Sequence, residues 1–130
     1  MTILVVDDDV IVIKSCRRIL EAEGFEVTTV ASADEALEKI KIYDFDLLLM
    51  DVKMPKHDGI FLMRGIKENW PDIPIIVMSG YPTPETIADV FRLGAVQFIP
   101  KPFKPDEFMK SIREVIRKMP HKTAFPTGAG

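Results

Sequence analysis

Several side chains that carry a charge or a hydroxyl group come at or just after the ends of short apolar segments. Three carboxylates follow the first apolar segment, a fourth follows the third, a hydroxyl follows the fourth and an ammonium follows the fifth. If these segments are parallel strands, the polar groups meet at one edge of the sheet, because parallel strands present their carboxyl ends on the same side. The residues are Asp7, Asp8, Asp9, Asp51, Ser79 and Lys101.

Such a set of residues suits the transfer of a phosphoryl group. Crowded carboxylates raise one another's pKa, and a hard, oxygen-liganded cation such as Mg²⁺ relieves their repulsion. With a metal bound, the carboxylate of Asp51 could attack phosphorus and form an acyl phosphate. Mg²⁺ and Lys101 would then stabilise the negative charge of the transferred group, and Ser79 could donate a hydrogen bond to it.

Each of these residues also has a simpler interpretation. The three N-terminal aspartates could cap a helix, whose N-terminus attracts anions, and we assign that role to Asp9. Taken alone, Asp51 could cap a loop, Ser79 could be a turn residue and Lys101 a solvated lysine. Their shared position at the ends of successive strands favours a common site instead. The neighbouring residues expected to shape turns are Gly59, Gly80, Pro100 and Pro102.

Five apolar segments predict strands. The runs Ile3–Val6 and Leu47–Met50 are continuously apolar, as expected of strands that are buried on both faces. The segment Glu26–Val30 instead alternates and contains β-branched residues. The predicted strands are 3–6, 26–30, 46–50, 73–78 and 96–99.

Helical periodicity fills the intervals between these strands. The first helix is expected to bury Cys16 and to end before Gly24, which suits a left-handed residue after a helix. The fourth helix is expected to bury Ile87, Val90 and Phe91. The predicted helices are 10–23, one that begins at Ser32, one that ends near Trp70, one that begins at Pro84 and one over 108–119.

Alternating strands and helices predict an α/β fold, a doubly wound five-stranded parallel sheet with helices on both faces. In such sheets, sites form outside the carboxyl ends of the strands, where the strand order reverses. Residues 1–119 are expected to form one domain. Residues 120–130 are rich in Pro and Gly and lack apolar periodicity, so we interpret them as a disordered tail, a linker or a vector-derived remnant.

Composition excludes several classes of protein. The net charge of −3 and pI of about 5.4 argue against a free-standing nucleic-acid binder, which would carry a basic face. The two histidines lie far apart, so no zinc site is suggested, and the single cysteine suits a reducing compartment. No apolar run approaches the ~20 residues of a membrane span, and no signal peptide is recognisable, so we expect a cytoplasmic location.

Four stretches of the sequence resemble the motifs of response regulator receiver domains. They are ILVVDDD (3–9), LLLMDVKMPKHDG (47–59), VMSG (77–80) and FIPKPF (98–103). Each motif alone is a weak signal, but four in this order and at this spacing are specific. The resemblance covers about residues 1–119, and it implies the flavodoxin-like (βα)5 fold with strand order 2-1-3-4-5.

The resemblance implies a role for each residue at the predicted sheet edge. Asp51 would be the phospho-acceptor and Asp8 a direct ligand of Mg²⁺, while Asp7 would hold the metal through water. The main-chain carbonyl of Lys53 would complete the protein ligands. Lys101 would pair with the phosphoryl group.

A conformational switch is also implied by the resemblance. Ser79 would be the switch hydroxyl and Phe98 the switch aromatic. The bond between Lys101 and Pro102 is expected to be cis, which is a proline feature. The positions that tune dephosphorylation within the family are held here by Lys53 and Tyr81.

By the same resemblance, the chain would receive its phosphoryl group from a sensor histidine kinase or a phosphotransfer protein of a two-component phosphorelay. Phosphorylation would reshape the face made by the fourth helix, fifth strand and fifth helix, to control an output domain or partner and to promote pairing of two copies. Segments 78–85 and 98–101 look most like receivers attached to transcriptional activators. The domain would catalyse only its own phosphorylation and dephosphorylation, and it would bind neither nucleic acid nor membrane directly.

Three other functions would use some of the same residues. A receiver-like interaction domain that never gains phosphate usually lacks an acidic, acceptor or lysine residue, and none is missing here. A haloacid dehalogenase carries Asp-x-Asp followed by Thr or Val two residues later, whereas Ile11 follows Asp9 and Lys53 follows Asp51 at that spacing. A nucleotide-binding module would need a glycine-rich phosphate loop after a strand, and the sequence has none.

Overall fold

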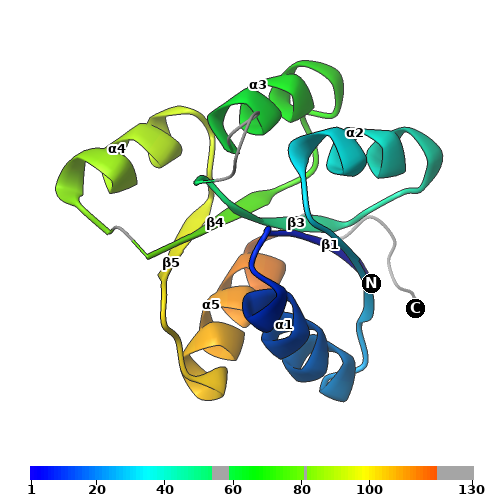
Figure 1. Ribbon diagram of the computed structural model, residues 1–130, viewed down its shortest axis with the longest axis vertical. Helices are drawn as coiled ribbons and strands as arrows, with labels where there is room; N and C mark the ends of the chain where they lie inside the picture. The colour runs from blue at the N-terminus through cyan, green and yellow to red at the C-terminus, as the bar shows by residue number, and fades with distance from the viewer. Residues whose placement is uncertain (54–58, 81, 120–130) are drawn as a thin grey trace.

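The computed structural model describes residues 1–53, 59–80 and 82–119, and strands and helices alternate through it (Figure 1). The strands are β1 (Thr2–Val6), β2 (Glu26–Val30), β3 (Leu47–Asp51), β4 (Ile75–Ser79) and β5 (Gln97–Pro100). The helices are α1 (Val10–Ala22), α2 (Ala33–Ile42), α3 (Gly59–Asn69), α4 (Pro84–Arg92) and α5 (Pro105–Lys118). The predicted loop positions 55 and 58, Tyr81 and the tail 120–130 lie outside the described residues.

The five strands form one parallel sheet in the order β2-β1-β3-β4-β5, which confirms the predicted fold. Helices α1 and α5 cover one face of the sheet, and α2, α3 and α4 cover the other (Figure 1). The chain runs from β1 outward to β2 and then returns to β3 on the other side of β1. The strand order therefore reverses between β1 and β3, where a site is expected at the carboxyl ends.

The central strands are buried on both faces, which explains their continuous apolar sequences. In β1, Ile3 and Val5 join the core that includes residues of α1 and α5, while Leu4 and Val6 join the core that includes residues of α2, α3 and α4. All four side chains are fully buried. Successive residues of a strand point to opposite faces, so only an unbroken apolar run fills both cores.

The C-terminal end of α1 and the burial of Cys16 follow from the sequence. Gly24 has a φ of 92°, a left-handed conformation that a side chain would strain, and the chain leaves the helix there as predicted. Cys16 is fully buried, and burial raises the pKa of its thiol to about 12. The predicted role of Cys16 as a core residue is therefore confirmed.

Several details differ from the sequence-based predictions, and α5 and β5 are offset from their predicted bounds by one to three residues. The prediction of a buried Phe91 is wrong: the residue is 42% exposed, because α4 lies beside the edge strand β5 and has a helical neighbour on one side only (Figure 1). Strand β4 begins at Ile75 rather than at residue 73, since Pro74 has no N–H for the ladder. Strand β3 begins after Asp46, whose carboxylate accepts a hydrogen bond from Thr2 N at 2.8 Å.

Among the described residues, no helix is both long and apolar enough to span a bilayer.

Candidate functional site

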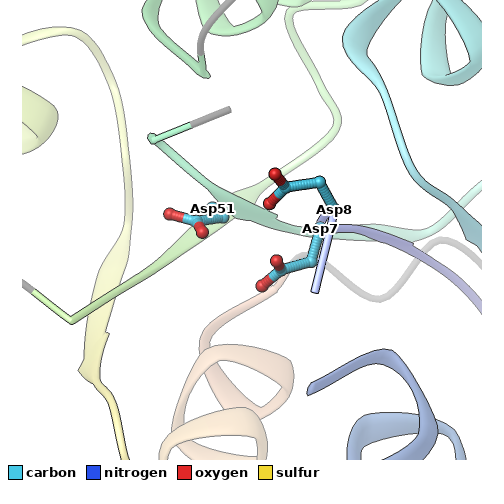
Figure 2. A group of neighbouring side chains, drawn as sticks. All are labelled: Asp7, Asp8 and Asp51. Carbon is cyan, nitrogen blue, oxygen red and sulfur yellow. The ribbon is translucent and has the colours of Figure 1, made fainter. Parts of the chain in front are cut away.

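Three carboxylates meet at the carboxyl ends of β1 and β3. Asp7 and Asp8 directly follow β1, and Asp51 is the last residue of β3, the strand that pairs with β1. Each residue offers a carboxylate oxygen that lies within 4.8 Å of the oxygens offered by the other two. Figure 2 shows the three side chains directed into the space beyond these strand ends. The predicted convergence is present at the point where the strand order reverses.

The fourth member of the site is Lys101, which follows β5. Its Nζ lies 2.7 Å from Oδ2 of Asp7 and 2.9 Å from Oδ2 of Asp51. The main chain of Lys101 is fixed by a hydrogen bond from its N–H to the carbonyl of Ser79, at 2.8 Å, and the bond to Pro102 is cis as expected. A single ammonium therefore bridges two carboxylates that come from neighbouring strands.

Burial and hydrogen bonding act in opposite directions on the pKa values of this group. The side chain of Asp7 is fully buried, and desolvation raises its pKa although hydrogen bonds from Lys101 and from the main chain of Asp9 act in the opposite direction. Burial lowers the pKa of Lys101, but its hydrogen bonds to Asp7 and Asp51 outweigh that effect, so its pKa is raised overall. The negative charge of this site is thus held at a cost in desolvation, which an added cation would reduce.

Asp9 is not part of the carboxylate group. Its Oδ1 accepts a hydrogen bond from Ile11 N at 2.9 Å, which makes Asp9 the N-cap of α1 and confirms the predicted role. Its own N–H donates to Oδ1 of Asp7 at 2.9 Å, and this contact fixes the buried carboxylate. A haloacid dehalogenase site would need the carboxylate of Asp9 for catalysis. The use of this carboxylate as a helix cap therefore argues against a site of that class.

Asp51 is nearly buried, at 6% exposure, and is held by the chain that follows it. Its Oδ1 accepts a hydrogen bond from the main-chain N–H of Lys53 at 2.9 Å. The other carboxylate oxygen contacts Lys101, as described above. The first residues after β3 therefore contact the Asp51 carboxylate, and the main chain of Lys53 lies next to the same site.

The two predicted switch residues occupy different places. Ser79 is fully buried at the end of β4, one residue beyond Met78, the β4 partner of Asp51. Phe98 is half-buried in β5 and packs against the core that includes residues of α2, α3 and α4. Ser79 thus ends the strand next to β3, while Phe98 lies three positions before Lys101 on the edge strand.

The site has the donor set of a hard divalent cation. Ligands on opposite sides of a Mg²⁺ ion are about 4.2 Å apart, so oxygens grouped within 4.8 Å need only small side-chain movements to share one ion. Asp8 is exposed and Asp51 is not, so an ion would enter from the side of Asp8. A carboxylate beside such an ion and beside an ammonium is suited to attack an electrophilic phosphorus.

A groove next to this site was not predicted from the sequence. It has a volume of about 610 Å³ and runs between α1 and the chain after β5. Ile11 and Phe103 are among its apolar lining residues, and Lys101 belongs both to the groove and to the carboxylate site. The periodicity of α1 identifies its buried side but carries no signal for a hollow beside an exposed residue such as Ile11, which is 75% exposed.

Comparison with known proteins gives one consistent family. Residues 3–113 match the family described as the response regulator receiver domain. The chain is 33% identical over 118 residues to the cell cycle transcriptional regulator CtrA of Caulobacter vibrioides, covering 91% of this chain and 51% of that protein. It is 39% identical over 116 residues to the hydrogenase transcriptional regulatory protein HoxA of Cupriavidus necator, covering 88% of this chain and 24% of that protein.

Solved structures agree with this comparison. A CheY-like receiver domain protein from Methanospirillum hungatei superimposes with a TM-score of 0.85 and 35% identity, over 91% of this chain and 94% of that one. NtrX of Brucella abortus superimposes with a TM-score of 0.86 and 34% identity, over 91% of this chain but only 27% of that one. The chain therefore spans about half or less of the length of CtrA, HoxA and NtrX.

Proposed function

Since the chain belongs to the response regulator receiver domains of two-component systems, we propose that it accepts a phosphoryl group on Asp51 with the help of Mg²⁺. The observation that supports the proposal is the grouping of the Asp51 carboxylate with an ammonium and two other carboxylates. Lys101 bridges Asp51 and Asp7, at 2.9 Å and 2.7 Å, and Asp7, Asp8 and Asp51 each offer an oxygen within 4.8 Å of the others, a group that could hold a cation. The donor would be a sensor histidine kinase or a phosphotransfer protein.

The transfer can be written with all bonds balanced. One carboxylate oxygen of Asp51 forms a bond to phosphorus while the bond from phosphorus to the donor breaks. The donor leaves as an imidazole when it is a phosphohistidine, or as acetate when it is acetyl phosphate. Bound Mg²⁺ would neutralise charge on the phosphoryl oxygens, held directly by Asp8, Asp51 and the main-chain carbonyl of Lys53, and through water by Asp7.

Lys101 has a role before and after the transfer. In the unphosphorylated chain its ammonium pairs with Asp7 and Asp51. After the transfer, an oxygen of the new phosphoryl group offers a stronger, more negative partner close to the same position. Lys101 would therefore stabilise the charge that develops on the group during transfer and would hold the product in place.

The signal would leave the site through Ser79 and Phe98. The hydroxyl of Ser79 would donate to a phosphoryl oxygen, and Phe98 would repack beside it, which changes the face made by α4, β5 and α5. Exposed apolar side chains of Phe91 and Val96, at 42% and 47%, lie near the end of α4 and just before β5. These side chains suit a face that pairs with a second copy or with another partner once the domain is phosphorylated.

The domain would work as the input part of a signalling system rather than as an enzyme for other substrates. CtrA and HoxA are described as transcriptional regulators, and we propose that this chain likewise controls an output domain or a separate partner. Residues 1–119 would form the receiver. Residues 120–130 would serve as a linker or are a vector-derived remnant.

Phosphate uptake tests the proposal directly. The chain is incubated with acetyl phosphate and Mg²⁺, and its intact mass is measured. One added phosphoryl group is expected, and EDTA should prevent it. Asp51→Asn should abolish the uptake, while the matched variant Asp9→Asn should retain it, because Asp9 caps α1 instead of facing the site. Uptake by Asp51→Asn at the wild-type rate would show that Asp51 is not the acceptor. No uptake by the wild type would favour an interaction domain that never gains phosphate.

A further inference from the structure

The first residue of α3, Gly59, lies unusually close to the main chain at the end of β3. Its N–H donates to the carbonyl of Val52 at 3.0 Å. A Cβ atom built on Gly59 would lie 2.4 Å from Cα of Val52 and 2.7 Å from the carbonyl oxygen of Asp51. Real Cβ atoms essentially never show contacts under 3.0 Å, so a side chain at this position would force a shift of its neighbours.

The restriction is steric and does not arise from the backbone conformation of Gly59. Among the described glycines, only Gly24 and Gly94 have a positive φ, so any residue could adopt the conformation of Gly59. The two nearest atoms belong to the main chain, which cannot turn aside as a flexible side chain such as Met50, at 3.1 Å, would. Adding a single methyl group must therefore separate the start of α3 from the end of β3.

The end of β3 is the part expected to move. Helix α3 is anchored by the fully buried side chains of Leu62, Met63 and Ile66, and displacing it would open gaps in the core. Moving the contact from 2.4 Å to the 3.4 Å of ordinary van der Waals contact requires a shift of about 1 Å. The segment that shifts includes the carbonyl of Asp51.

We propose that Gly59 is a positioning residue for phosphoryl acceptance, an inference that rests on the function proposed above. By allowing α3 to close onto Val52, Gly59 fixes the turn in which Lys53 N donates to the Asp51 carboxylate at 2.9 Å. The same turn carries the main-chain carbonyl of Lys53, the proposed third protein ligand of Mg²⁺. Close packing at Gly59 thus sets the distance between this turn and the carboxylate of Asp8.

The proposal predicts a large effect on the site from a small change outside it. Mg²⁺ requires nearly ideal octahedral geometry at 2.0–2.1 Å, so a ligand displaced by about 1 Å is lost or strained. Gly59→Ala should weaken Mg²⁺ binding by about tenfold or more, the lower end of the effect seen when partners of metal ligands are removed. Phosphorylation by acetyl phosphate should slow by about 100-fold, as expected for a 1 Å misplacement of a reacting group.

Two control variants separate positioning from simple loss of stability. Gly65→Ala adds the same methyl group to the same helix, where it would meet only Cδ2 of Leu37 at an ordinary 3.7 Å. Leu62→Ala destabilises the core below α3 without touching the approach of Gly59 to β3. Mg²⁺ affinity is measured by calorimetry on all variants in trimethylamine N-oxide, which favours the folded state. The NMR shift of the Lys53 amide is recorded without metal.

The expected result is that only Gly59→Ala loses Mg²⁺ affinity and shifts the Lys53 amide, while both controls bind as the wild type does. Wild-type affinity in folded Gly59→Ala would overturn the inference and leave the proposed function intact. A Gly59→Ala chain that stays unfolded in trimethylamine N-oxide would also overturn it, since the residue would then serve the fold as a whole. Absence of Mg²⁺ binding in the wild type would instead remove the proposed function itself.

Discussion

The ammonium of Lys101 lies 2.7 Å from Oδ2 of Asp7, whose side chain is fully buried at the end of β1. Even with this contact, the pKa of Asp7 is raised, because burial outweighs the hydrogen bonds that favour its charged form. The fold therefore keeps a carboxylate where ionisation is unfavourable. Such a buried carboxylate lowers the stability of the fold once it ionises, and that energetic cost can be measured.

The first prediction is the pH dependence of that cost in EDTA. The folded pKa of Asp7 lies above its unfolded value of 3.8, so the stability it contributes is present below pH 3.8 and is lost as pH rises through the folded pKa. Asp7→Asn has no carboxylate to ionise at this position, so the variant avoids this loss of stability. At neutral pH the variant should be more stable than the wild type by about 1 kcal/mol, the size of an ordinary single-site effect.

Urea unfolding followed by circular dichroism at several pH values measures the difference. The advantage of Asp7→Asn should shrink as pH is lowered toward 3.8. An advantage that grew toward low pH would have the wrong sign and would show that Asp7 is not the group responsible.

The second prediction distinguishes two neighbouring aspartates. Asp8→Ala should weaken Mg²⁺ binding by about tenfold or more, because Asp8 belongs to the carboxylate group. Asp9→Ala should leave the affinity unchanged but lower the free energy of unfolding by about 1 kcal/mol, because its carboxylate caps α1. Titration calorimetry and chemical unfolding give the two quantities. Equal losses of affinity in both variants would contradict the assignment of Asp9 to the cap alone.

Much of the fold could be predicted from the sequence because its signals are local. Continuous apolar runs identify β1 and β3 as buried on both faces, and the helices between the strands require a parallel sheet. Those two facts also bring Asp7, Asp8 and Asp51 to one edge. The exposure of Phe91 could not be predicted in the same way, because it depends on α4 lying beside an edge strand, a relation that no periodicity within α4 encodes.

The candidate site could likewise be predicted only in part. Which residues reach the edge follows from strand ends, but the pairing of Lys101 with both Asp7 and Asp51 depends on how β5 closes against β4. The role proposed for Gly59 could not be predicted either, since the sequence indicates only a turn there. The 2.4 Å approach to Val52 arises when α3 packs onto the end of β3, which is a tertiary contact.

The third prediction concerns the thiol of Cys16. Burial raises its pKa from 9.0 to about 12, so at pH 8 only about one thiol in 10⁴ is ionised. Because the thiolate is the reactive form, labelling by an aromatic disulfide reagent should be very slow in the native chain and complete within minutes in denaturant. Rapid labelling under native conditions would contradict the burial of Cys16 between α1 and the sheet.

The fourth prediction concerns the exposed residue of α4. Phe91→Ser should change the free energy of unfolding by less than about 0.5 kcal/mol, since the side chain is 42% exposed. It should nevertheless weaken the pairing of two copies promoted by beryllofluoride, measured by sedimentation. Ile42→Ser is the matched control, because Ile42 is also apolar and exposed but lies at the end of α2. Equal effects of both variants on pairing would place the paired surface elsewhere.

The last prediction concerns how the proposed phosphorylation of Asp51 would reach the face made by α4, β5 and α5. Ser79 ends β4, which pairs with β3, the strand of Asp51, and Phe98 on β5 pairs in register with Val77 of β4. If the hydroxyl of Ser79 moves toward the phosphoryl group, the space it leaves should be filled by Phe98, because packed interiors leave few stable voids. A ligand shifts such an equilibrium only by its different affinity for the two states, and the hydroxyl of Ser79 supplies part of that difference.

Ser79→Ala should therefore still take up phosphate on Asp51 while transmitting less of the change, whereas Ser79→Thr, which keeps the hydroxyl, should transmit more than the alanine variant. NMR shifts of residues 83–119 are compared with and without beryllofluoride in the wild type and both variants. Beryllofluoride should bind all three, so a smaller response in Ser79→Ala reports coupling and not lost binding. A full wild-type response of residues 83–119 in Ser79→Ala would refute this route, and the signal would then have to pass from Asp51 through Lys101 and the chain after β5.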